Sequence, residues 1–483
     1  MFKKIIKNSY LYLFYAFLFT IPFQKRHIFN LATAKIGDIF VEWQTITIYA
    51  SDILFALCLI FWVINLILVK TKKQENHPTG DHSKGGNKTN PFIFILPIAI
   101  FFFSLISVFV NYNNYLDHNV AIFRMIKLAE FILLIIFIIL NLNTKKRLIS
   151  AIYVLITSGV LSSILVIIQY LKQQTLGLTI LGEPLVLPVL QNVAKIVLDN
   201  GNVIMRAYGT FPHPNVLAGF LLASMVILIG LMIYQLNNYG LDKPKYRILT
   251  ILLSFGLILE FIAFIFTFSR TAWIAFVIAL AILVISLRKK IVIALNNIKT
   301  NSFYHPFIII ILAIIFIIVA QWPQITARAA IADQNGDKAV SNRAFYNQIS
   351  FNMIKSHPFF GIGYNNFTSQ MSKYTNQKIE WWQYQPAHNI YLLIFAESGI
   401  FSLLSFLGLI IVISYQLSAF AFASADKQVN SSIFNFVCFS ILVAFLFIAL
   451  FDHYLWTIQQ GQLLFWLVLG LTATKINQQK IEK

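Results

Sequence analysis

Apolar segments of about 20 residues recur along the whole chain, and this length constrains the fold most because a helix needs it to cross a bilayer. The chain of 483 residues is 58% hydrophobic and only 11% charged, with a mean hydropathy of +0.74. Such values exclude an ordinary soluble globular domain. We therefore expect an all-α fold, a polytopic membrane bundle of helices with one large extracytoplasmic loop.

About twelve transmembrane helices are predicted from the length and hydropathy of these segments. Their expected ranges are 9–23, 50–69, 91–110, 120–142, 147–171, 214–235, 247–267, 270–288, 304–321, 389–415, 431–450 and 455–473. An even number of spans places both termini on the same side of the membrane.

The strong positive charge, a formal net of +19, raises the question of a nucleic-acid partner. The basic residues gather, however, at the two termini and in alternate loops, at positions 3–7, 70–88, 145–147, 243–247, 288–299 and 475–483. The intervening loops at 111–119 and 451–454 carry none. This bias predicts a multi-pass protein of the cytoplasmic (inner) membrane with both termini cytoplasmic, and no nucleic acid among its partners.

The domain organisation expected from these patterns has three parts. Residues 1–200 form N-terminal transmembrane helices with a flexible cytoplasmic linker near 70–90, because that segment is polar and contains glycine. Residues 201–474 form a second transmembrane region that includes an external loop at 322–388. Residues 475–483 form a cytoplasmic tail.

Two predicted outward segments are too long to be simple turns. The first extends from 172 to 214, and no motif assigns a role to its residues 173–205. The second contains several tryptophans, which argue against disorder. Within it, Phe345, Ile349 and Met353 recur every four residues after Ser341 and predict an amphipathic helix on the membrane surface over 341–355.

Polar residues cluster where the outward-starting helices are expected to begin. The clusters are 206–215 (RAYGTFPHPN), Ser269–Arg270, His388–Asn389 and Asp452–His453. Helix N-termini carry partial positive charge and free N–H donors, which suit a phosphate or pyrophosphate. Arg206, Arg270 and Arg343 add guanidinium groups that bind such groups bidentately. The implied ligand is an anionic lipid headgroup.

Four motifs carry a resemblance to a known family. FTFSRTAW contains Arg270, RAFYNQISFNMIKSHPFFGIGYNNF begins at Arg343, PAHNIYLLIFAESGIFSLL contains His388, and DHYLWTIQQGQ begins at Asp452. In order, spacing and membrane side, over roughly residues 200–470, the chain resembles the O-antigen ligase and O-antigen polymerase superfamily of membrane glycosyltransferases. These enzymes build polysaccharides of the cell envelope such as lipopolysaccharide.

The resemblance implies a mechanism and its partners. The donor would be a glycan linked to undecaprenyl pyrophosphate, and the acceptor a glycan, a lipid or a protein, at an outward-facing site without metal or cofactor. Arg270, Arg343 and Arg206 would bind the donor pyrophosphate, and His388 would act on the acceptor hydroxyl as a general base or as a binding residue. Possible acceptor contacts or structural supports would be His213, Asn215, Asn389, Glu397, Asp452 and His453.

Each of these residues also has a purely structural interpretation. An arginine at a membrane interface is usually a snorkelling anchor, and a histidine at a helix start caps the backbone. Pro214 at a first helical position explains the turn around His213 and Asn215. Asp452 and His453 fit a tight turn between two spans. Glu397 lies inside a span, where a carboxylate is costly.

Three functions remain open at this point. A ligase would transfer a finished glycan to another acceptor, and a polymerase would join lipid-linked repeat units with the same chemistry. The layout, with one dominant external loop late in the chain, favours the ligase. A transporter of lipid-linked glycan or of a small solute also suits twelve spans, but no inverted repeat is detectable.

Overall fold

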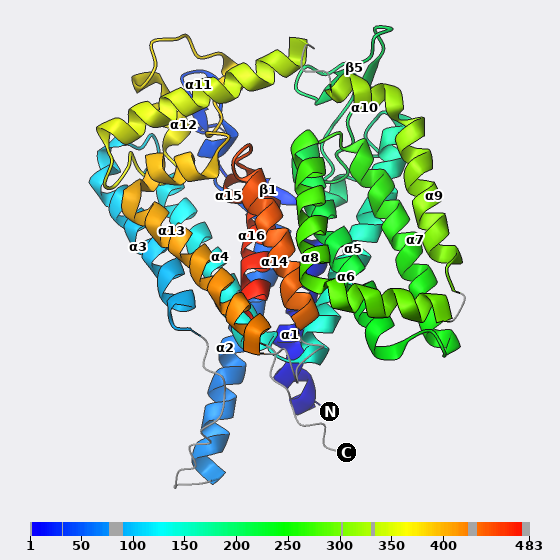
Figure 1. The fold of residues 1–483 in the computed structure, drawn as a ribbon. Helices are drawn as coiled ribbons and strands as arrows, with labels where there is room; N and C mark the ends of the chain where they lie inside the picture. Colours follow the sequence, from blue (N-terminus) through cyan, green and yellow to red (C-terminus); the bar gives the residue numbers. More distant parts are fainter. Residues whose placement is uncertain are drawn as a thin grey trace.

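The computed structural model describes residues 2–30, 32–76, 90–300, 303–329, 334–423 and 432–475. In this part of the chain there are sixteen α-helices (Figure 1). The longer ones are α1 (Phe2–Thr20), α2 (Ala50–Asn76), α3 (Phe92–Val110), α4 (His118–Asn141), α5 (Lys145–Lys172), α6 (Pro214–Tyr239), α7 (Pro244–Phe266), α8 (Arg270–Thr300), α9 (His305–Ala320), α11 (Gln334–Ser356), α13 (Ile390–Ala423), α14 (Ser432–Ile448) and α16 (Gln459–Ala473). The short ones are α10 (Trp322–Ala329), α12 (Phe367–Gln370) and α15 (Tyr454–Thr457).

Three small antiparallel hairpins are the β-structure of the described residues. Strand β1 (Arg26–Ile28) pairs with β4 (Thr47–Tyr49), and β2 (Lys35–Ile36) pairs with β3 (Ile39–Phe40). The third hairpin joins β5 (Lys195–Val197) to β6 (Val203–Met205). None of the three sheets has more than two strands, so the prediction of an all-α membrane bundle is confirmed.

Every predicted span overlaps a helix, but not every helix meets the usual criteria for crossing a bilayer. Seven helices of the described residues are long and apolar enough, and α9 with α10, bent by 64°, makes an eighth if the pair is one broken span. Helix α14 is apolar but shorter, α16 has only 15 residues, and α1 and α4 each carry three charged side chains or more. The chain is a multi-pass membrane protein, and the count of twelve spans stays a prediction.

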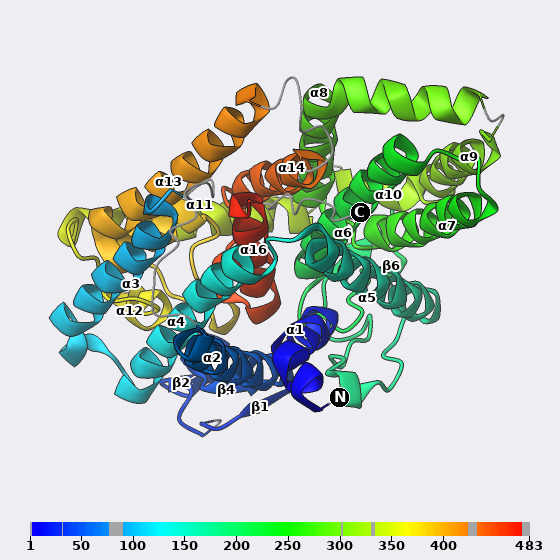
Figure 2. The same ribbon diagram turned by 90° about the horizontal axis from the view of Figure 1, so that it is seen from below.

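The two ends of the bundle differ in what they carry. Helix α1 begins at one end, and α11 crosses the other end next to α10 and β5 (Figure 1). We call the end that carries β5, α10, α11 and α12 the loop end. Seen along the bundle, α3, α11, α12 and α13 form one group and α5 to α10 a second, with α14 and α16 between them (Figure 2).

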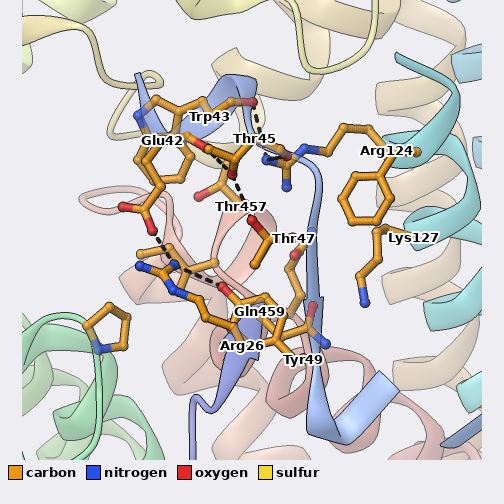
Figure 3. Close-up of a pocket in the computed structure, with 14 residues that line it drawn as sticks. Arg26, Glu42, Trp43, Thr45, Thr47, Tyr49, Arg124, Lys127, Thr457 and Gln459 are labelled. Atoms are coloured by element: carbon orange, nitrogen blue, oxygen red, sulfur yellow. Dashed lines mark hydrogen bonds and ion pairs between the residues drawn. The ribbon is translucent and has the colours of Figure 1, made fainter. Parts of the chain in front are cut away.

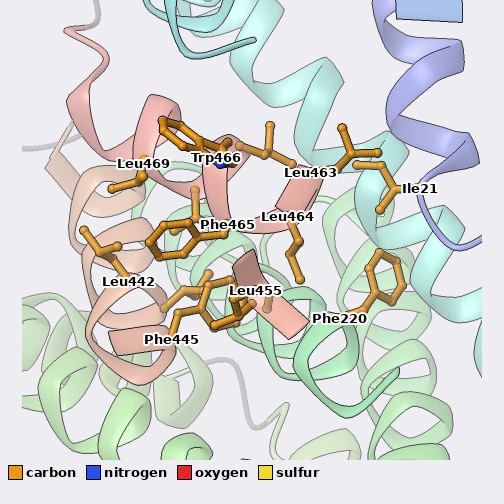
Figure 4. Packing of buried hydrophobic residues seen from close by; sticks show 14 of the residues in the cluster. Ile21, Phe220, Leu442, Phe445, Leu455, Leu463, Leu464, Phe465, Trp466 and Leu469 are labelled. Atoms are coloured by element: carbon orange, nitrogen blue, oxygen red, sulfur yellow. The ribbon is translucent and has the colours of Figure 1, made fainter. Parts of the chain in front are cut away.

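The centre of the bundle is a short helix, α16. All of its residues are buried; its Phe465 packs beside Leu442 and Phe445 of α14, and its Leu464 lies on the side of Phe220 of α6 (Figure 4). Helix α6 is buried almost as completely. Because neighbouring helices shield α16 from lipid, it does not need the length of a span. The residues just before α16 therefore lie in the middle of the bundle, at its loop end.

Four expectations about the helices need correction. Helix α2 continues to Asn76, so the start of the predicted 70–90 linker is helical, while residues 77–89 and the tail 476–483 lie outside the described residues. Helix α8 extends to Thr300, well past the predicted end at 288. The 341–355 helix is part of α11, but its buried Ile349 and Met353 pack toward α13 rather than toward lipid. Helix α13 is interrupted at Gly399.

A third long segment at the loop end was missed from the sequence. Residues 24–49, between α1 and α2, form two of the hairpins and a 3-10 turn at Glu42–Gln44. Asn30 holds this segment together, because its Oδ1 accepts from Ile46 N at 2.7 Å and its Nδ2 donates to Gln44 O at 2.9 Å. The segment thus packs as a folded unit beside α4 and α16.

Candidate functional site

Two histidines from distant parts of the chain meet at the loop end. The rings of His388 and His453 lie 4.7 Å apart, edge to face. They meet because Ile390 N at the start of α13 donates to Ala449 O, after α14, at 2.8 Å. Tyr346 of α11 stacks on the other face of His388 at 5.0 Å, and Trp43 contacts His453 at 5.2 Å. The four rings form a row across the end of the bundle.

The tautomer of His388 follows from its backbone contact. Its Nδ1 lies 3.2 Å from Pro386 O, and a carbonyl only accepts, so Nδ1 carries the proton. The lone pair of the neutral ring is therefore on Nε2. His388 is also partly exposed, whereas only 5% of His453 is exposed. Of the two, His388 is the histidine that a substrate at the loop end can reach.

A chain of hydrogen bonds connects this histidine pair to a buried arginine. Asp452 Oδ1 accepts from His453 N at 2.8 Å, and Asp452 Oδ2 accepts from Asn215 Nδ2 at 2.8 Å. Asn215 Oδ1 in turn accepts from Arg206 Nη2 at 2.7 Å. His213 caps α6 through a 3.1 Å bond from Asn215 N to its Nδ1. The structure thus joins three of the four polar clusters into one network.

The fourth cluster is held by a tight turn before α8. Arg206 Nε donates to Thr267 O at 2.7 Å, and Arg328 Nε of α10 donates to Phe268 O at 3.2 Å. Phe268 has a φ of 47°, which is unfavourable for a bulky side chain, and its fully buried ring packs on Tyr170. This turn starts α8 with Arg270.

Helix α11 brings a further arginine to the same end. Arg343 Nε donates to Phe451 O at 3.1 Å, directly before Asp452 in the chain. The same helix supplies Tyr346, one turn further on, to His388. The crossing helix therefore sets both a cation and an aromatic ring beside the histidine pair.

The charges at this end are mainly positive. Burial, together with Arg328 and Arg270 nearby, lowers the pKa of Arg206 to about 9, so the guanidinium remains charged at neutral pH. Burial raises the pKa of Asp452, but His453, His388 and His213 outweigh it and hold the pKa below its ordinary value. Arg206, Arg270 and Arg343 thus gather near Asp452 among the described residues, and such a group of cations suits an anionic ligand.

The histidines are neutral at physiological pH. Burial lowers the pKa of His453 and of His213 to about 3 each. Burial also lowers the pKa of His388, with Arg343 acting in the same direction and Asp452 against it. A neutral imidazole with an available Nε2 is the form that accepts a proton.

Two of the predicted site residues have structural contacts. Asn389 caps α13 by accepting from Leu392 N at 3.1 Å. Glu397 is buried, and its carboxylate accepts from Phe367 N at 3.1 Å, while its main-chain oxygen accepts from Gly363 N at 3.0 Å. Glu397 thereby fixes the loop after α11 against the break in α13. It is not among the residues that surround His388.

This position of Glu397 predicts a loss of stability in a variant. Glu397→Ala leaves a buried N–H without an acceptor, which costs about 1–3 kcal/mol. We expect its unfolding temperature in detergent to fall by several degrees, whereas Glu397→Gln, which keeps an acceptor oxygen, should stay closer to the native protein. An unchanged unfolding temperature in the alanine variant, combined with lost activity, would instead indicate a direct contact with substrate.

The long segment over 173–205 supports the arginine rather than forming an independent unit. Glu183 accepts from Gln169 Nε2, Leu176 N and Leu178 N, each at 2.8 Å. Gln169 Oε1 accepts from Gly209 N at 2.8 Å, and Gln173 Oε1 accepts from Met205 N at 2.6 Å. These contacts hold the backbone on both sides of Arg206. The apolar composition of the segment gave no sign of this support.

Three residues of the site were not identified from the sequence, namely Arg328, Tyr346 and Trp43. Arg328 lies in the predicted external loop, and a basic residue there was a usable signal. Tyr346 was within the predicted amphipathic helix but one position away from its assigned apolar stripe. Trp43 gave no signal, because the segment before α2 was treated as a simple connection.

Among the described residues, no group of three or more His, Cys, Asp or Glu side chains is arranged to hold a metal ion.

One comparison with known proteins gives a match. Residues 253–407 match the family model described as O-antigen ligase, and this match supports membership of the chain in the O-antigen ligase superfamily. It includes Arg270, Arg328, Arg343 and His388, while Arg206 and Asp452 lie outside it. No curated protein matches the chain. The family implies a glycosyltransferase-like ligase activity, with a lipid-linked glycan and an acceptor as partners.

Proposed function

We propose that this chain, whose residues 253–407 carry the O-antigen ligase match, transfers a glycan from a polyprenyl-pyrophosphate donor to an acceptor hydroxyl. The loop end faces outward from the cytoplasmic membrane in this proposal, and both termini face the cytoplasm. The observation that carries it is the group of four arginines beside a neutral histidine pair at one end of the bundle.

The donor pyrophosphate binds the arginines. Arg270 at the N-terminus of α8 and Arg343 on α11 supply guanidinium N–H groups, and the N-terminus of α8 adds partial positive charge. Arg206 and Arg328 lie behind the turn that carries Arg270, and they contribute positive charge. Positive charge here stabilises the leaving pyrophosphate more as its negative charge increases, which lowers the barrier to transfer.

His388 acts on the acceptor in this mechanism. Its Nε2 takes the proton of the acceptor hydroxyl as the oxygen attacks the anomeric carbon of the donor sugar. The bond from that carbon to the pyrophosphate breaks, and the lipid pyrophosphate leaves with the bonding electrons. Asp452 helps to stabilise the positive charge that His388 gains, since it raises the pKa of His388.

The first test is the glycan that accumulates when the gene is deleted. For a ligase we expect long lipid-linked chains stranded on the outer face of the membrane, measured by the chain-length profile and by accessibility to an external probe. Single repeat units stranded there would show a polymerase of the same superfamily. Material trapped on the cytoplasmic face would show a transporter and would contradict the proposal. A native copy of the gene in the same strain is the control.

A further inference from the structure

A small pocket lies at the loop end beside residues that contact His453. Its walls come from the 24–49 segment, from α4 and from the start of α16 (Figure 3). Thr457 is part of the lining, and its Oγ1 lies 2.6 Å from His453 Nδ1. Trp43, also in the lining, contacts the ring of His453. Thr457 and Trp43 therefore connect the pocket to His453.

The lining has the chemistry of a saccharide site. The lining includes one indole ring, the hydroxyl groups of Thr45, Thr47 and Tyr49, and the side-chain amide of Gln459 (Figure 3). Aromatic rings cover the apolar faces of sugars, and hydroxyl and amide groups bond to their oxygens. The cavity holds about 40 Å³, room for a few water molecules, so it accommodates the edge or one substituent of a sugar rather than a whole oligosaccharide.

Three cations line the pocket, and one of them lacks a carboxylate partner. Arg26 pairs with Glu42, and Lys127 Nζ lies 2.8 Å from Asp52. Within the described part of the chain, Arg124 donates only to two main-chain oxygens, those of Trp43 at 3.2 Å and Thr45 at 3.3 Å.

One further donor of this guanidinium, its Nε–H, points to a ligand. Arg124 Nε is buried and has no hydrogen-bond partner among the described residues. A buried N–H of this kind usually has a partner in the functioning protein. An oxygen of a bound sugar, or of an acidic group on it, would provide that partner.

The position fits the geometry of the transfer. The attacking oxygen and the leaving pyrophosphate lie on opposite sides of the anomeric carbon in a direct displacement. With the pyrophosphate on the arginines, the acceptor approaches from the side of His453, Thr457 and Trp43. The ring of Trp43 lies 5.2 Å from that of His453, which in turn lies 4.7 Å from the ring of His388. An acceptor glycan whose terminal sugar lies against His388 thus extends toward the pocket.

We infer that this pocket binds the acceptor saccharide and that Arg124 is its principal specificity residue, an inference that rests on the proposed function. The 24–49 segment then acts as one wall of the acceptor site. This assigns a role to a part of the chain that lies outside the residues matched to the family.

The test is a binding measurement with a glycan that carries no pyrophosphate. The probe is the acceptor saccharide, prepared from the unmodified acceptor that accumulates in the deletion strain and separated from the lipid-linked donor. We expect the purified native protein in detergent to bind it, and Arg124→Gln to bind it at least 10-fold more weakly. Lys35→Gln, an exposed charge change in the same segment but outside the lining, should bind as the native protein does.

Two further variants make the outcome decisive. Trp43→Phe keeps a ring beside His453 but removes indole area, and it should weaken binding several-fold even if Arg124→Gln fails to fold. Arg270→Ala should bind this probe normally, because no pyrophosphate is present. Native-like binding by both pocket variants, or no binding by an active native protein, would overturn the inference. The deletion experiment would still decide the proposed function separately.

Discussion

Replacement of His388 by alanine is expected to abolish glycan transfer while leaving the protein folded in the membrane. Its Nε2 is the acceptor atom of a neutral, partly exposed imidazole, and removal of a general base typically costs about 100-fold to 10,000-fold in rate. The measurement is the formation of the glycan product by a strain carrying only the variant, normalised to the amount of folded protein. Normal product formation by His388→Ala would show that His388 is not the general base.

A matched control and a pH profile separate the base from a structural role. His357 is an exposed histidine of the same external segment, and His357→Ala should retain transfer. Burial lowers the pKa of His388 below the ordinary 6.5, so the ring is still mostly neutral at that pH. The purified protein should therefore keep more than half of its maximal rate at pH 6.5 and lose activity only as the pH falls further. Half-loss above pH 6.5 would contradict a base with a lowered pKa.

Replacement of Arg270 is expected to be nearly as damaging. Arg270→Ala removes guanidinium contacts to the pyrophosphate, each worth about 1.5–3 kcal/mol, and two such bonds correspond to a loss of roughly 100-fold or more. Arg270→Lys should also be impaired, because an ammonium group cannot reproduce the planar fork that binds phosphate bidentately. The measurement is the dependence of the transfer rate on donor concentration for the purified variants.

The far end of the same helix provides the control. Arg288 is exposed and lies near the opposite end of the bundle from Arg270, so Arg288→Ala should transfer glycan at the native rate. Full activity in Arg270→Lys would reduce Arg270 to a point charge or a membrane anchor. Full activity in Arg270→Ala would show that the turn before α8 does not bind the pyrophosphate.

The helices themselves were largely predictable from the sequence, because hydropathy acts along the chain and needs no knowledge of neighbours. The predictions failed where a helix depends on its surroundings. Helix α16 was read as one of twelve equivalent spans, yet it is the buried centre of the bundle, and hydrophobicity does not distinguish a lipid-facing helix from a buried one. The break in α13 was missed because Gly399, with a φ of 78°, has a meaning only beside the backbone of Phe359.

The candidate site was predictable to the extent that its residues start helices. Arg206, Arg270, His388 and Asp452 each precede or open an apolar segment, so a common membrane side was enough to group them. Glu397 was placed near this group because it follows His388 closely in the chain, but its carboxylate binds the backbone of Phe367. Proximity in sequence did not indicate the direction in which the side chain points.

The sequence by itself predicted a membrane protein, the gathering of its polar motifs at one end of the bundle and the residue types that meet there. Those properties depend on composition and on the order of apolar and polar segments. Only the tertiary structure decided which motifs touch, because contacts such as Asn215 to Asp452 join residues more than 200 positions apart. It also decided that Trp43 and Arg124 line a pocket beside His453, since a pocket exists only where separate helices leave space between them.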